Sequence, residues 1–68
     1  MGTLTFDITV KHENNLLWCV CKQEPCVYGY YRNEGEASVS LRNLLKLELM
    51  YKNNDVPNDN IQLNFLYE

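Results

Sequence analysis

The chain has 68 residues, of which 46% are apolar, and its formal net charge at pH 7 is −3. This length predicts one domain spanning residues 1–68, and the apolar fraction argues against a disordered chain. Its longest apolar runs are only a few residues and its N-terminus lacks a basic, signal-like stretch, so we expect a cytoplasmic protein that does not enter a membrane.

The first half of the chain has the period of β-strands. Residues 4–11 place an apolar side chain at every second position, which predicts a strand with one buried face. Glu13-Asn14-Asn15 then predicts a hairpin turn, because Asn tolerates positive φ. Residues 16–22 form a second strand with apolar residues on both faces, which is typical of a strand inside a sheet. We assign its Trp18 and Val20 to the core.

A break at residues 23–25 separates this strand from a third, aromatic strand at residues 27–31. Gly29 in its middle predicts a bulge or a close backbone approach. Asn33 is the expected N-cap of a helix, with Glu36 three residues on, as in a capping box. The helix carries a broad apolar arc, and we expect three of its leucines to pack on the sheet. The predicted core is Phe6, Ile8, Val10, Trp18 and Val20 against Leu41, Leu44 and Leu45.

The C-terminal part begins with a polar stretch at residues 52–60, which we interpret as a loop. Residues 61–67 alternate again and form a last strand. The element order is therefore strand-strand-strand-helix-strand. It predicts an α+β fold, with an antiparallel three- or four-stranded sheet and one helix packed on one face.

Residues with catalytic or metal-binding chemistry are few. The three cysteines, Cys19, Cys21 and Cys26, lack the spacing of a zinc site, and His12 is the only histidine. We interpret the cysteines as reduced apolar residues and His12 as a surface residue of the hairpin. We expect no enzyme activity, no metal and no cofactor, because no nucleophile stands beside a base. Paired carboxylates would require Asp7, Glu24, Glu36 or Glu48 to converge, whereas we interpret Asp7, on the polar face of its strand, and Glu48 as solvated.

The aromatic residues Trp18, Tyr28, Tyr30 and Tyr31 have two interpretations. They can form a stacking platform for single-stranded nucleic acid. They can also belong to the core and to a protein interface, where Tyr and Trp are enriched. The scattered basic residues favour the second interpretation, because phosphate binding requires clustered Lys and Arg. A phage-type inhibitor of a host enzyme is a third, weaker hypothesis.

The stretch from Trp18 to Tyr51 resembles the HicB-like domain family. The resemblance lies in Trp18, in the Pro25-Cys26-Val27-Tyr28 turn and strand, and in Glu36-Ala37 at the helix start. Glu48-Leu49 and the last strand resemble solitary members of that family. It implies a partial RNase H-like fold and an antitoxin-like binding domain that docks onto a small basic toxin. It implies no RNase activity and no contact with DNA, because we expect no DNA-binding segment after the last strand.

Self-association is also expected, because a chain this small builds only a limited core. An unpaired edge strand can pair with a second copy. We predict a homodimer in which the last strand makes the contact, since Leu66 projects from its otherwise polar face. The alternative is a monomer whose edges are protected by lysines and asparagines. The candidate interface residues are Trp18, Tyr28, Tyr30, Tyr31, Leu63, Phe65 and Leu66.

Overall fold

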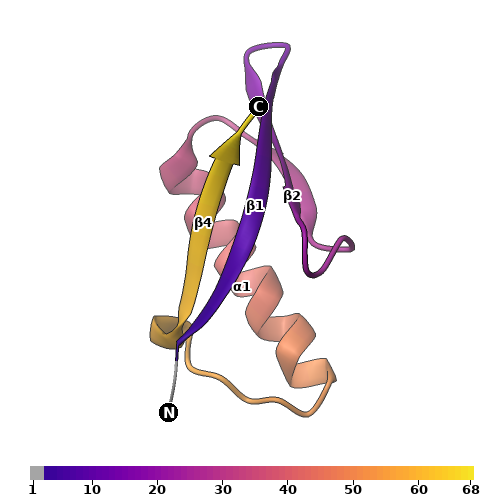
Figure 1. Cartoon of the computed structure of the whole chain (residues 1–68), viewed down its shortest axis with the longest axis vertical. Helices are drawn as coiled ribbons and strands as arrows, with labels where there is room; N and C mark the ends of the chain where they lie inside the picture. Colours follow the sequence, from indigo (N-terminus) through magenta and orange to yellow (C-terminus); the bar gives the residue numbers. More distant parts are fainter. Residues whose placement is uncertain (1–2) are drawn as a thin grey trace.

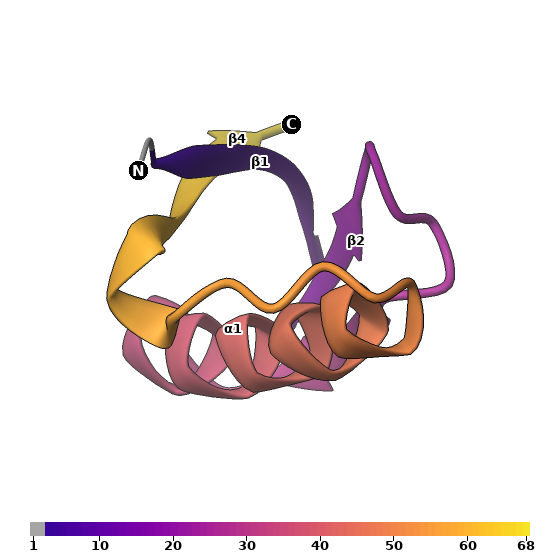
Figure 2. The same ribbon diagram turned by 90° about the horizontal axis from the view of Figure 1, so that it is seen from below.

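A computed structural model describes residues 3–68. Four strands form one mixed sheet in the order β3-β2-β1-β4, and a single helix, α1, packs across one face of it (Figures 1 and 2). The predicted order of elements and the α+β class are confirmed. No helix in the described part of the chain has the length and apolar character needed to cross a membrane. The elements are β1 (Leu4–Glu13), β2 (Leu16–Cys21), β3 (Tyr28–Tyr31), α1 (Glu34–Tyr51), the 3₁₀ turn η1 (Asn58–Asn60) and β4 (Ile61–Tyr67).

The sheet was predicted to be antiparallel, but it is mixed, because β4 runs parallel to β1. Two antiparallel steps, β1 to β2 and β2 to β3, return the chain to the direction of β1. Helix α1 has 18 residues and is therefore about 27 Å long, which carries the chain back along the sheet once. β4 must then start from the same end as β1, beside which it lies.

The β1–β2 hairpin decides which side chains enter the core. Asn14 and Asn15 have φ angles of 51° and 66°, the left-handed values of a type I′ turn. This two-residue turn pairs Glu13 with Leu16, and the register continues to Val10 opposite Cys19. Residues directly opposite one another share a face of the sheet, so Leu17, Cys19 and Cys21 join the buried side of β1.

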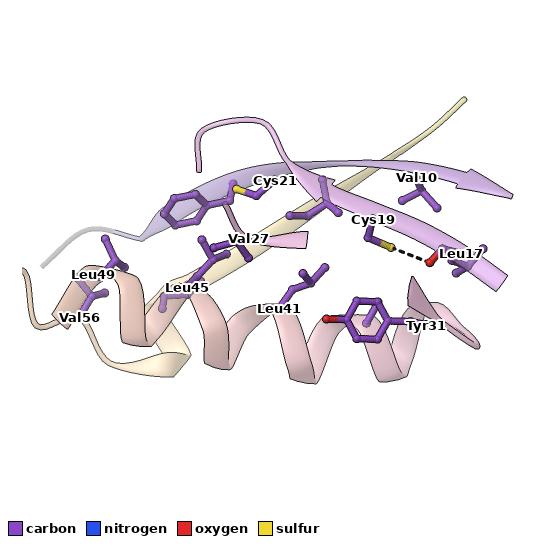
Figure 3. Packing of buried hydrophobic residues seen from close by; sticks show 14 residues of the cluster. Val10, Leu17, Cys19, Cys21, Val27, Tyr31, Leu41, Leu45, Leu49 and Val56 are labelled. Atoms are coloured by element: carbon purple, nitrogen blue, oxygen red, sulfur yellow. Dashed lines mark hydrogen bonds between the residues drawn. The ribbon is translucent and has the colours of Figure 1, made fainter. Parts of the chain in front are cut away.

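The prediction that Trp18 and Val20 lie in the core is therefore wrong. Both are only partly buried, and they lie on the face of the sheet that points away from α1. The core between sheet and helix is instead lined by Cys19, Cys21 and their neighbours (Figure 3). Both cysteine thiols have a raised pKa, because burial disfavours the thiolate.

Helix α1 begins as predicted at Asn33, whose side-chain Oδ1 accepts a hydrogen bond from the backbone N–H of Glu36 at 2.8 Å. Its buried residues follow an i, i+4 row: Ala37, Leu41, Leu45 and Leu49. Leu44 was also expected in the core but is 38% exposed. It lies on the flank of the helix, because three residues after Leu41 the chain has turned 60° short of a full turn.

The loop between α1 and β4 is fixed by contacts from one flank of the helix. Lys46 Nζ donates hydrogen bonds to Asp55 Oδ1 at 2.7 Å and to the carbonyl of Val56 at 2.6 Å. Val56 itself is buried in the core. Arg42 Nε donates to the carbonyl of Ile61 at 3.1 Å. This flank of α1 therefore faces β4, and the opposite flank must face β3.

Candidate functional site

The face of the sheet opposite α1 is not covered by any described element (Figure 2). Three aromatic residues, Trp18, Tyr28 and Tyr30, gather on this open face, and we call them the aromatic cluster. Trp18 lies directly opposite Tyr30 on the neighbouring strand, with ring centroids 4.7 Å apart. Its ring centroid is 5.5 Å from that of Tyr28. Tyr28 and Tyr30 are each more than half exposed, so the cluster forms an accessible aromatic surface.

Strand alternation separates the aromatic cluster from Tyr31. Tyr28 and Tyr30 point outward, whereas Tyr31 points toward α1, is buried and forms a hydrogen bond of 3.0 Å with the hydroxyl of Ser40. The close approach predicted at Gly29 is present, because a Cβ atom there would lie 2.8 Å from the Tyr31 hydroxyl. Gly29 thus makes room for the Tyr31 ring, which holds β3 against the helix.

Polar groups beside the aromatic cluster are balanced in charge. The Tyr30 hydroxyl donates a hydrogen bond to Glu13 Oε1 at 3.1 Å, and this bond raises the pKa of Tyr30. Lys11 lies directly opposite Trp18 on β1. Farther along the sheet, Asp7 accepts hydrogen bonds from Asn64 and Gln23, which hold its pKa below the ordinary value. The open face therefore offers one carboxylate and one ammonium next to the aromatic rings.

The remaining predicted interface residues divide between the two faces. Leu66 lies on the open face, across Thr9 from Val20, and extends the apolar surface beyond the aromatic cluster. Leu63 and Phe65 point the other way and pack, partly buried, against the core. The structure thus joins Trp18, Tyr28, Tyr30 and Leu66 on one surface and places Tyr31, Leu63 and Phe65 on the other face. β4 is an edge strand, as its proposed pairing role requires.

Three groups with catalytic potential, His12, Cys26 and Glu36, lie apart from one another. His12 is exposed near the hairpin, where its ring lies 6.1 Å from that of Tyr67. The exposed Cys26 follows the far end of β2. Glu36 is exposed in the first turn of α1. In the described part of the chain, therefore, no histidine lies next to a thiol.

Two of the carboxylates considered for metal binding, Glu24 and Glu48, do converge, together with Cys26. Glu24, Cys26 and Glu48 offer ligand atoms that lie within 4.8 Å of one another. Their donor set can hold a metal ion, but Lys52 Nζ already lies 2.8 Å from both carboxylate oxygens of Glu24. This contact raises the pKa of Lys52. The sequence gives no signal for this convergence, because it arises only where the loop after β2 meets the end of α1.

The open face lacks the shape of a small-molecule site. No pocket was found among residues 3–68, whereas sites for small ligands are concave. A shallow aromatic surface is more typical of contacts with a macromolecule. Comparison of the chain with protein-family models, with curated proteins and with solved structures gave no significant match.

Proposed function

We propose that this chain is a non-catalytic protein-binding module whose partner docks on the aromatic cluster of the open sheet face. The observation that carries the proposal is the packing of Trp18 against Tyr28 and Tyr30, with both tyrosines more than half exposed. Tyr and Trp provide much of the binding energy at protein interfaces, because they bury a large area with few rotatable bonds. Large aromatic residues on an uncovered face are costly to solvate and gain most when a partner covers them.

The partner that fits best is a small basic protein in the cytoplasm. The net charge of −3 favours a cationic partner. A Lys or Arg side chain of that partner can lie over the Trp18 ring and reach the Glu13 carboxylate beside Tyr30. The resemblance to HicB-like antitoxins supports the same chemistry, since those domains neutralise small basic toxins. Three free thiols, two of them buried, support a reducing compartment.

A binding titration tests this proposal. Small basic proteins encoded beside this chain in its genome are purified and added while the fluorescence of Trp18, the only tryptophan, is recorded. We expect saturable binding that Tyr30→Ser weakens at least about tenfold, the effect of losing an interface hot spot. Met50→Ser is the matched control, because Met50 is 51% exposed, against 52% for Tyr30, but lies on the helix. Equal weakening by both substitutions, or no bound basic protein, would contradict the proposal.

A second candidate function is binding to single-stranded nucleic acid. The exposed rings of the aromatic cluster favour it, because successive bases stack on such side chains. The adjacent charges oppose it, since Lys11 is offset by Glu13 and leaves no positive groove for phosphates. The same fluorescence titration with a mixed-sequence oligonucleotide separates the two functions. Quenching that declines steeply with added salt would support the nucleic-acid function.

A further inference from the structure

Exposed apolar side chains gather along the β3 side of the molecule. Tyr28 and Tyr30 lie on β3, and Leu44, Leu47 and Tyr51 share one flank of α1 through their i, i+3 and i+7 spacing. We call these five residues the β3 margin. The flank faces β3 near Leu44, because Ser40, one turn earlier, forms a hydrogen bond with the hydroxyl of Tyr31. Its end near Tyr51 lies by the loop before β3, where Lys52 binds Glu24.

The backbone of β3 adds free hydrogen-bonding groups to this surface. Among the strands of residues 3–68, β2 alone pairs with β3. Cys21 N–H donates to the carbonyl of Val27 at 3.0 Å, which fixes the alternation along the strand. Odd-numbered residues therefore direct their backbone groups to β2, and the N–H and C=O groups of Tyr28 and Tyr30 face the free edge. The strand carries no charge and no proline, two of the devices that protect edge strands, although it is only four residues long.

These groups are arranged so that the edge can pair with itself. We propose that two copies of the chain associate by antiparallel pairing of β3, about a two-fold axis at Gly29. In this register Tyr28 pairs with Tyr30 of the partner subunit, and each pair satisfies the free backbone groups. The neighbouring flank of α1 supplies Leu44 and Leu47 for contact between the two helices. No member of the β3 margin is charged, so the net charge of −3 does not place like charges in contact.

The area of the β3 margin corresponds to a weak, transient dimer. Tyr51 is 86% exposed, Leu47 62% and Tyr28 55%. With about 200 Å² for a whole tyrosine side chain, the margin exposes about 500 Å² per copy. Two copies then bury somewhat less than about 1,000 Å², the lower limit of specific interfaces, and we expect dissociation constants in the micromolar range. The eight-stranded sheet so formed places two aromatic clusters side by side on one face.

Sedimentation equilibrium of the full chain tests this association. The wild-type mass should rise from 8.0 kDa to twice that value as the concentration passes through the micromolar range. Leu47→Glu should raise the dissociation constant at least about tenfold, because it buries a charge in the interface. Val39→Glu is the matched control on the outer face of α1, with 61% exposure against 62% for Leu47. It should leave the dissociation constant unchanged.

A second variant addresses the backbone contact directly. Tyr30→Pro removes an N–H that faces the free edge and breaks no backbone hydrogen bond within one chain, although it also removes the bond from the Tyr30 hydroxyl to Glu13. It should weaken the dimer while circular dichroism keeps the wild-type helix signal. A wild-type chain that stays at the monomer mass at every concentration overturns the proposal. So does a dimer that Leu47→Glu and Tyr30→Pro leave intact, since it would form elsewhere, for example along β4. Neither result affects binding of a basic partner to the aromatic cluster, which the fluorescence titration measures separately.

Discussion

Leu44 and Leu45 provide the sharpest test of the packing. They are neighbours in the sequence, but Leu45 is fully buried between α1 and the sheet, whereas Leu44 is 38% exposed on the flank. Leu45→Ala removes buried methyl groups and leaves a cavity that its neighbours cannot fill, at a cost of about 2–5 kcal/mol. Leu44→Ala removes a side chain already in contact with water and leaves no closed cavity, so about 1 kcal/mol is expected.

Urea unfolding, followed by the circular dichroism of α1, measures both free energies of unfolding. A 68-residue domain has a total stability of about 3–10 kcal/mol, so Leu45→Ala is measured in a stabilising osmolyte alongside the wild type. Protein concentrations are kept below the micromolar range, where self-association through Leu44 would add to stability. Equal losses for the two variants, or a larger loss for Leu44→Ala, would refute the assignment of the buried helix face.

Two further predictions concern the hairpin and the open face. Asn15→Gly should raise the free energy of unfolding by about 0.5–1 kcal/mol, because glycine adopts the positive φ of this turn position without steric cost; a lower urea midpoint would contradict the type I′ turn. The hydrogen bonds of Asp7 to Asn64 and Gln23 lower its pKa in the folded state. Ionised Asp7 therefore stabilises the fold at pH values above its ordinary pKa of 3.8. This contribution is lost as the pH falls through the lower folded-state pKa. Asp7→Asn should therefore flatten the acid limb of the stability curve, and an acid limb identical to that of the wild type would contradict this role.

Local patterns in the sequence predicted most of the elements. The alternation through residues 4–10 identified a strand and its buried face. When only one face of a strand is apolar, only that face can pack against the core. Asn33 identified the start of α1, since its side chain caps the helix whatever the surrounding fold. Trp18, Tyr28 and Tyr30 were selected by residue type alone. Alternation along β3 also contained the signal that Tyr31 lies on the other face.

The buried face of β2 was ambiguous because both of its faces are apolar. The signal that could have decided it was the Asn14-Asn15 turn, since a two-residue hairpin fixes Glu13 opposite Leu16 and thereby places Cys19 inside. The broad apolar arc of α1 was ambiguous in a similar way. Only the position of the helix across the sheet buries Leu45 and leaves Leu44 on the flank.

Sequence by itself therefore determined the elements, their order and the residue types of the aromatic cluster, because these depend on contacts within a few residues. The tertiary structure alone decided the parallel pairing of β4 and the exposure of Leu44 on the flank of α1. Each of these depends on where one 18-residue helix crosses the sheet. That crossing is set by contacts between residues distant in the sequence, such as Tyr31 with Ser40 and Arg42 with Ile61.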